Sequence, residues 1–342
     1  MAAGWVLSGL GAAVAAALVA LAVTGAWYRA ASLHGIVDIP NLRSSHARIV
    51  PTGGGVGICA GVAAGIIVLT RSLGPVDPAL TTLLLCAAAI AAVGFVDDAR
   101  GLGPVPRLLV QLSVASVLIA QVGPLRRIDL FGASLELGLL AVPLSLVWIV
   151  GVTNAYNFMD GIDGLAAGQG VLAGLALFVA AGTGGAVGLA GLALVVATAC
   201  AGYLAWNFPP ARIFMGDVGS GTLGFLFAGI GLVGSRRGTF SLMVVVLCLG
   251  AFLFDTTFTL ARRIQRGELW YRAHRSHVYQ RYVGVGFSHL QVTSVEYLAM
   301  ALLAIAALLY PRADALGQGI LLVLWIGAGF VAVLLVERLE KR

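Results

Sequence analysis

Charge is scarce in this sequence. Only 11% of its 342 residues are Asp, Glu, Lys or Arg, whereas 60% are hydrophobic and the mean hydropathy is +0.98. So few charges cannot cover the surface of a water-soluble domain of this size, so the composition excludes that class and indicates a membrane protein. The 46 glycines suit helices that pack closely within a bilayer.

The sequence also lacks paired cysteines and a soluble face on which positive charge is clustered. No two of the four cysteines have the spacing of a redox or metal-binding pair, so each is predicted to be a small buried hydrophobic residue. The pI is about 9.5, but the basic residues are spread over short loops, which excludes a nucleic-acid surface. The first 28 residues contain no Lys or Arg, so they predict a spanning helix and not a cleaved signal peptide.

Eleven apolar runs approach the roughly 17–25 residues that a bilayer-spanning helix needs. They cover residues 4–28, 53–70, 79–96, 107–123, 137–153, 164–182, 184–205, 219–234, 240–260, 291–310 and 317–336. The sequence shows no internal repeat. It therefore predicts one all-α integral membrane domain over residues 1–342, with its two termini on opposite sides of the membrane.

The 21 basic residues indicate the orientation. Fifteen fall in the loops after the odd-numbered spans and at the C-terminus, and six fall in the other loops. Cytoplasmic loops are the ones enriched in Lys and Arg, so the N-terminus is predicted outside and the C-terminus inside. Residues 127–137 alternate in polarity around Gly132, which predicts a small β-hairpin on the outer face.

Most acidic and polar residues gather in five predicted cytoplasmic loops. These loops are residues 29–52, 97–107, 154–164, 206–219 and 261–290. Charge within a bilayer is costly and usually functional, but these residues lie at the ends of spans, where water reaches them. This favours a site at the cytoplasmic interface over a transporter, which would place polar or broken segments near the middle of the bilayer.

Two of the loops contain closely spaced acids. In GFVDDARGL, Asp97 and Asp98 are adjacent, and adjacent side chains on a helix diverge by about 100°, so the two are predicted to face different partners. The stretch NAYNFMDGIDG begins at Asn154, which is predicted to bind substrate. A helix that continued through the stretch would place three further polar side chains on one face. Those three are Asn157, Asp160 and Asp163.

Two further loops contain residues that can donate hydrogen bonds to an oxyanion such as phosphate. Arg43, Ser45 and His46 are predicted to bind phosphate, and the glycines at 53–55 could present backbone N–H groups to it. Arg212 offers a forked donor to an oxyanion.

Asp217, in a turn with glycine beside it, is either a Mg²⁺ ligand or the cap of the next helix. Both interpretations stay open.

The longest loop contains a basic cluster, formed by His274, Arg275, His277 and Arg281. An H-x-x-H pair without a third ligand does not favour zinc. An anionic substrate explains the cluster better, and Asp255 is predicted to pair with an arginine or to face the site. Together, acids and cationic donors at one interface point to metal-assisted phosphoryl transfer.

Five stretches together resemble the polyprenyl-phosphate N-acetylhexosamine-1-phosphate transferases of glycosyltransferase family 4. The stretches are RSSH, GFVDDARGL, NFMDGIDGLAAG, NFPPARIFMGDVGS and HRSHVYQR. The phospho-N-acetylmuramoyl-pentapeptide transferases are more distant relatives. The resemblance implies transfer of a sugar 1-phosphate from a UDP-sugar to polyprenyl phosphate such as undecaprenyl phosphate, with release of UMP. It also implies Mg²⁺, or Mn²⁺ in its place, and a location in the bacterial inner membrane with the active site on the cytoplasmic face. A homodimer is compatible with it.

The resemblance also implies roles for individual residues. Asp217 would be the leading metal ligand and Asp97 the base that deprotonates the lipid phosphate for direct attack. The catalytic set would further include Asp98, Asp160 and Asp163, which with Asn157 organise metal, nucleotide or diphosphate. The histidines and Arg275 would clamp phosphate or sugar. A two-step route through an aspartyl phosphate stays open.

The same stretches also indicate which UDP-sugar is the donor. HRSH has fewer histidines than the muramoyl-pentapeptide branch, which favours an N-acetylhexosamine donor. RSSH together with HRSHVYQR leans toward the branch that initiates O-antigen synthesis. The sugar could then be N-acetylglucosamine, N-acetylfucosamine or N-acetylquinovosamine.

Overall fold

The computed structural model of the chain describes residues 2–40, 48–269 and 274–342. Its long helices are α1 (Ala2–His34), α2 (Gly55–Leu73), α3 (Pro78–Arg100), α4 (Pro104–Val122), α5 (Ala141–Phe158), α6 (Leu165–Thr183), α7 (Val187–Asn207), α8 (Asp217–Arg236), α12 (His289–Leu309) and α13 (Ala315–Glu340). Shorter helices are α9 (Leu242–Cys248), α10 (Gly250–Gln265), α11 (Val278–Gly284) and the 3-10 turns η1 (Gly138–Leu140) and η2 (Tyr310–Arg312). The strands are β1 (Val37–Asp38), β2 (Val50–Pro51), β3 (Arg127–Leu130) and β4 (Ala133–Glu136).

The described part of the chain forms a multi-pass membrane protein. Ten of its helices are long and apolar enough to cross a membrane, and the pair α9 and α10 makes an eleventh if the two cross as one span. This confirms the predicted all-α class. The predicted span over residues 240–260 consists of two helices, α9 and α10, which meet at an 80° bend.

The bend exposes backbone carbonyl groups that a straight helix would have satisfied. The Cys248 carbonyl accepts a hydrogen bond from Gln169 Nε2 at 2.9 Å, and the Gly250 carbonyl accepts one from Trp325 Nε1 at 2.9 Å. Broken helices are tolerated in a membrane only where such groups find partners inside the protein. The sequence between the two helices contains no proline, so the bend depends on partners contributed by α6 and α13.

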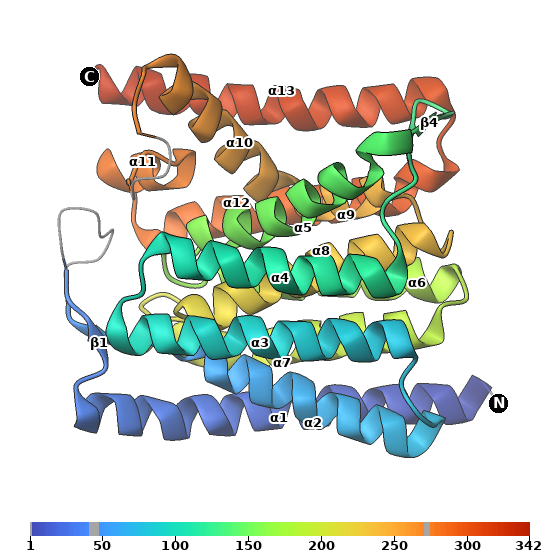
Figure 1. The fold of residues 1–342 in the computed structure, drawn as a ribbon. Helices are drawn as coiled ribbons and strands as arrows, with labels where there is room; N and C mark the ends of the chain where they lie inside the picture. Colours follow the sequence, from blue (N-terminus) through green and yellow to red (C-terminus); the bar gives the residue numbers. More distant parts are fainter. Residues whose placement is uncertain (1, 41–47, 270–273) are drawn as a thin grey trace.

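Successive helices run in alternating directions, and the termini lie at opposite ends of the bundle (Figure 1). We call one end the site end: it carries the last turns of α3, α5 and α7 and the first turns of α4, α6 and α8. The opposite end carries the predicted hairpin, in which β3 and β4 pair antiparallel with Arg127 opposite Glu136. The ribbon of β1 and β2 at the site end was not predicted.

Helix α8 is the centre of the bundle. In its apolar window 94% of the residues are buried, against 17% in α13, which is largely exposed to lipid. The segment before α2 is tied to the start of α8: the Gly54 and Gly55 N–H groups bind the Phe214 and Met215 carbonyls at 2.9 Å each. The idea that these glycine N–H groups are available to phosphate is therefore wrong for Gly54 and Gly55.

Helices α3 and α8 approach each other most closely at Gly94. A Cβ atom there would lie 2.5 Å from the Asp217 carbonyl oxygen and 2.6 Å from the Val218 nitrogen, both of them backbone atoms that cannot rotate away. Glycine is therefore required where α3 crosses the first turn of α8.

This contact predicts opposite outcomes for two identical substitutions. Gly94→Ala should lower the free energy of unfolding by about 1–3 kcal/mol, because α3 and α8 must separate to admit the methyl group. Gly151→Ala is the matched control: no heavy atom lies within 4 Å of the added Cβ, so alanine's helix propensity should leave stability unchanged or slightly higher. Thermal unfolding of the purified variants in detergent measures both, and equal stabilities would refute the tight crossing.

Candidate functional site

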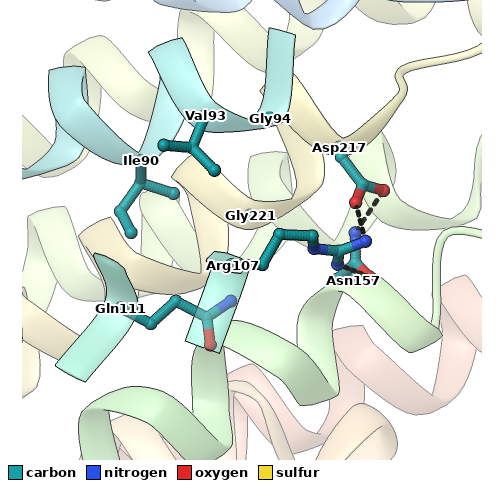
Figure 2. A pocket seen from close by; sticks show the side chains of 8 residues that line it. All are labelled: Ile90, Val93, Gly94, Arg107, Gln111, Asn157, Asp217 and Gly221. Atoms are coloured by element: carbon teal, nitrogen blue, oxygen red, sulfur yellow. Dashed lines mark hydrogen bonds and ion pairs between the residues drawn. The ribbon is translucent and has the colours of Figure 1, made fainter. Parts of the chain in front are cut away.

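A pocket opens at the site end between α3, α4, α5 and α8 (Figure 2). Its walls are apolar on the α3 side and polar where α4 and α5 meet α8. The lining residues are Ile90, Val93, Gly94, Arg107, Gln111, Asn157, Asp217 and Gly221. Residues from three of the five predicted loops, 97–107, 154–164 and 206–219, therefore lie together in this pocket.

Arg107 is the hub of this pocket. Its Nη1 donates to Asp97 Oδ2 at 2.8 Å and forms an ion pair with Asp217 Oδ2, while Nη2 donates to Asn157 Oδ1 at 3.2 Å. Asn157 Nδ2 in turn donates to Asp217 Oδ1 and to Ser220 Oγ, at 2.8 Å each. One guanidinium and one amide thus hold two carboxylates, from α3 and α8, in a single network. Figure 2 shows the part of it formed by Arg107, Asn157 and Asp217.

Arg107 was not predicted as a site residue. In the sequence it is one of the fifteen basic residues that indicate the cytoplasmic side of the membrane. A signal was available, since Arg107 and Gln111 are four residues apart and lie on one face of α4. Asn154, predicted to bind substrate, instead exchanges hydrogen bonds with Gln111 one turn deeper, with Asn154 Nδ2 2.7 Å from Gln111 Oε1. Asn154 therefore holds Gln111, which lines the pocket.

Asp98 faces away from Arg107 and supports α8. Its Oδ1 accepts the Asp217 N–H at 2.8 Å and its Oδ2 accepts the Val218 N–H at 3.1 Å. The prediction that Asp97 and Asp98 face different partners is confirmed. The alternative that Asp217 caps its own helix is wrong, since Gly216 is the N-cap residue and makes no side-chain bond. Asp98, on α3, thus accepts the first N–H groups of α8. The Asp217 carboxylate is not needed for this and lines the pocket.

The turn between α5 and α6 is not helical. Helix α5 ends at Phe158, and Gly164 begins the next helix with φ at +79°. The common face expected for Asn157, Asp160 and Asp163 therefore does not form. Asn157 stays on α5 in the pocket network, and the two acids lie in the turn.

Asp163 is bound by two neighbouring segments. It accepts the Ala211 N–H at 3.0 Å, its Oδ1 lies 3.1 Å from His289 Nδ1, and its carbonyl accepts from Thr293 Oγ1 at 2.9 Å. Burial opposes ionisation of Asp163, but the hydrogen bonds from His289 and the Ala211 N–H outweigh it and lower the pKa. Asp163 therefore connects the turn to the loop after α7 and to α12.

Asp160 behaves differently. Among the residues that the structure describes, none donates a hydrogen bond to its carboxylate. Burial raises the pKa of Asp160 to about 8, and the negative charges of Asp217, Asp98 and Asp163 add to the effect. Asp160 is thus within the electrostatic reach of the pocket acids, and a cation placed among them would favour its ionised form.

His277 is bound by Asp255, which, like Asp98 and Asp163, also accepts hydrogen bonds from backbone N–H groups. Asp255 Oδ1 lies 2.9 Å from His277 Nδ1 and accepts the Val278 N–H at 3.0 Å, while Oδ2 accepts the Tyr279 N–H at 3.1 Å. A carboxylate only accepts, so the His277 nitrogen that faces Asp255, Nδ1, carries a proton. Asp255 therefore orients His277 and anchors the start of α11.

His274 stacks beside His277, with ring centroids 4.9 Å apart. Burial, and then the nearby His277 and Arg263, lower the pKa of His274 to about 4, so this ring is neutral at physiological pH. Its Nδ1 accepts the Ser276 N–H at 3.4 Å, which places its proton on Nε2. His274 therefore presents an uncharged ring, with an Nε2–H donor, beside His277.

Three predicted cationic ligands lie away from the pocket network. Arg212 is exposed, with its guanidinium 5.7 Å from the Trp206 ring centroid, and Arg275 is exposed. Arg281 is buried and donates to Glu340 from Nε at 2.8 Å and from Nη2 at 2.7 Å. The predicted phosphate ligands Arg43, Ser45 and His46 lie outside the described residues.

The donor atoms of the pocket fit a hard cation. Asp97 Oδ1 is buried without a hydrogen-bond partner, and Asp217 Oδ2 contacts Arg107 without accepting a hydrogen bond. Mg²⁺ is usually bound through one or two carboxylates together with waters and substrate phosphates, so this pair suffices for it. Over the ranges that the structure describes, no group of three His, Cys, Asp or Glu side chains could hold a metal, which disfavours a zinc-type centre.

Comparison with known proteins gives consistent matches. Residues 80–235 match the glycosyl transferase family 4 model. The chain is 34% identical over 303 residues to a probable undecaprenyl-phosphate N-acetylglucosaminyl 1-phosphate transferase of Bacillus subtilis, covering 86% of this chain and 83% of that protein. It is 30% identical over 338 residues to the decaprenyl-phosphate N-acetylglucosaminephosphotransferase of Mycobacterium tuberculosis, covering 85% and 80%.

A shorter match reaches the muramoyl-pentapeptide branch. The phospho-N-acetylmuramoyl-pentapeptide-transferase of Acaryochloris marina is 33% identical over 191 residues, which is 52% of this chain and 48% of that protein. The full-length matches and the family model together show that this chain belongs to glycosyl transferase family 4, the family of polyprenyl-phosphate N-acetylhexosamine-1-phosphate transferases.

Proposed function

We propose that this protein transfers an N-acetylhexosamine 1-phosphate from a UDP-sugar to a polyprenyl phosphate such as undecaprenyl phosphate, releasing UMP. The observation that carries the proposal is the pocket in which Arg107 bridges Asp97 and Asp217 at the ends of membrane-spanning helices. A lipid phosphate and a water-soluble nucleotide can meet only at such an interface. The excess of basic residues at this end supports a cytoplasmic active site in the bacterial inner membrane.

The reaction exchanges one phosphorus–oxygen bond for another. An oxygen of the lipid phosphate attacks the sugar-bearing phosphorus, the bond to the UMP oxygen breaks, and UMP leaves with that electron pair. Asp97 is the candidate base for the proton of the lipid phosphate, because its Oδ1 is buried beside Arg107 without a partner. Mg²⁺ held by Asp217, or Mn²⁺ in its place, would neutralise charge on the diphosphate oxygens.

The remaining pocket residues fix these groups in place. Arg107 supplies a forked guanidinium that suits a phosphate group, and Asn157 keeps Asp217 oriented through a 2.8 Å hydrogen bond. Asp98 holds the first turn of α8. Asp160, whose pKa is about 8 without ligands, would lose its proton as positive charge enters the pocket.

The sugar is proposed to contact the histidine pair. Neutral His274 offers an Nε2–H donor, and Asp255 fixes the His277 ring beside it, an arrangement that suits the hydroxyl and amide groups of a sugar. Both full-length relatives are named for N-acetylglucosamine, so UDP-N-acetylglucosamine is the first donor to test. The product would initiate a cell-surface polysaccharide of the O-antigen type.

The reaction itself is tested with a panel of donors. Purified protein with Mg²⁺ and undecaprenyl phosphate should release UMP from a UDP-N-acetylhexosamine, and none without the lipid. N-acetylglucosamine, N-acetylfucosamine and N-acetylquinovosamine donors are compared with UDP-N-acetylmuramoyl-pentapeptide by chromatography of UMP. Release that ignores the lipid, or that occurs only with the pentapeptide donor, would refute the proposal.

The metal role of Asp217 is tested by removing its charge. Asp217→Asn should abolish turnover at every Mg²⁺ concentration, because the amide no longer binds a hard cation well, while the thermal unfolding temperature stays near that of the wild type. Glu136→Asn, at an exposed position on the hairpin, is the control and should remain fully active. Near-normal activity of Asp217→Asn would remove it as the metal ligand.

The adjacent acids Asp97 and Asp98 should fail in different ways. Asp97→Asn should lower kcat by about 10²–10⁴ with a small change in stability, as expected for a general base. Asp98→Asn should lower the free energy of unfolding by about 1–2 kcal/mol, because the amide keeps one of the two acceptors that bind α8. Turnover and thermal unfolding of both variants are measured together, and the reverse assignment would contradict the site.

A further inference from the structure

Helix α11 cannot hold its position by itself. It has seven residues, fewer than an isolated helix needs to be stable in water. Its first residues follow His277, so the position of the helix sets the position of that ring. Asp255 anchors the beginning of α11 through the Val278 and Tyr279 N–H groups.

The second anchor lies on α13. Arg281 donates two parallel hydrogen bonds to Glu340, from Nε at 2.8 Å and from Nη2 at 2.7 Å. The Arg281 side chain is 8% exposed, so the pair is shielded from competing water on the arginine side. Bidentate pairs of this kind fix geometry as well as supply energy.

An apolar contact accompanies the ion pair. Val278 of α11 packs with Val333 and Val336 of α13 in a small buried cluster. The Tyr282 hydroxyl group donates to the Ala332 carbonyl at 2.8 Å. The last turns of α13 therefore hold one side of α11, although most of α13 faces lipid.

We propose that Glu340 is a positioning residue for the donor-sugar site: through Arg281 it fixes α11, and through α11 it fixes His277. This inference rests on the proposed function for the identity of the donor. It also assigns Arg281 to the support of α11, in place of the phosphate contact expected from the sequence. Glu340 itself touches neither substrate.

The test compares Glu340→Gln with Glu136→Gln, the same change at an exposed position on the hairpin. Loss of a charge-assisted hydrogen bond should raise KM for the UDP-sugar about tenfold in Glu340→Gln, with kcat within about twofold of wild type. Arg281→Gln should raise KM at least as much as Glu340→Gln, because Arg281 also lies 3.8 Å from Glu337 Oε1, and the double variant should match Arg281→Gln. Glu136→Gln should match the wild type.

Hydrogen exchange provides a readout that does not depend on turnover. Amides of residues 278–284 should exchange about tenfold faster in Glu340→Gln than in Glu136→Gln, with no change in α8. Unchanged exchange in α11 would overturn the inference even if the wild type transferred no sugar, an outcome that would refute only the proposed function. A raised KM in Arg281→Gln with a normal KM in Glu340→Gln would also overturn it, because Arg281 would then bind the substrate directly.

Discussion

The carboxylate of Asp98 accepts the first two N–H groups of α8, and the geometry of the pocket depends on this contact between α3 and α8. The first N–H groups of a helix have no partner within the helix, and burying them without one is costly. Helix α8 lies at the centre of the bundle, so its start must be satisfied by the protein. Since Asp98 does this from α3, with Gly94 allowing the close approach, Asp217 is free for chemistry.

Two other acids act in the same way. Asp255 binds the start of α11 and orients His277, and Asp163 ties the turn after α5 to Ala211 and His289. Each uses a carboxylate to bind backbone N–H groups of another segment, so the loops at the site end form one connected layer. Asp97 and Asp217 instead converge on Arg107. Of the six acids predicted for the site, three thus bind backbone N–H groups and two meet at Arg107, while the sixth, Asp160, lies in the turn after α5.

Much of the fold could be predicted because lipid imposes a simple rule on length and polarity. The spans, the hairpin and the convergence of the loops followed from apolar runs and turn residues. The bend between α9 and α10 could not be predicted, because Gln169 and Trp325, which satisfy the freed carbonyls, lie far away in sequence. Asp97 and Asp98 were separated correctly by helical geometry. The structural partners of Asp163 and Asp255 and the hub position of Arg107 depend on contacts between distant segments, which the spacing of residues does not encode.

The central claim is that the metal binds where Asp97 and Asp217 converge on Arg107, and not at the acids that bind backbone N–H groups. Anomalous diffraction from crystals soaked with Mn²⁺ tests it most directly, because Mn²⁺ prefers the same oxygen ligands as Mg²⁺ and can be located by its scattering. The account predicts one anomalous peak beside Asp97 and Asp217, where Arg107 now bridges them. A peak beside Asp98, Asp163 or the histidine pair, with none at Asp217, would contradict it.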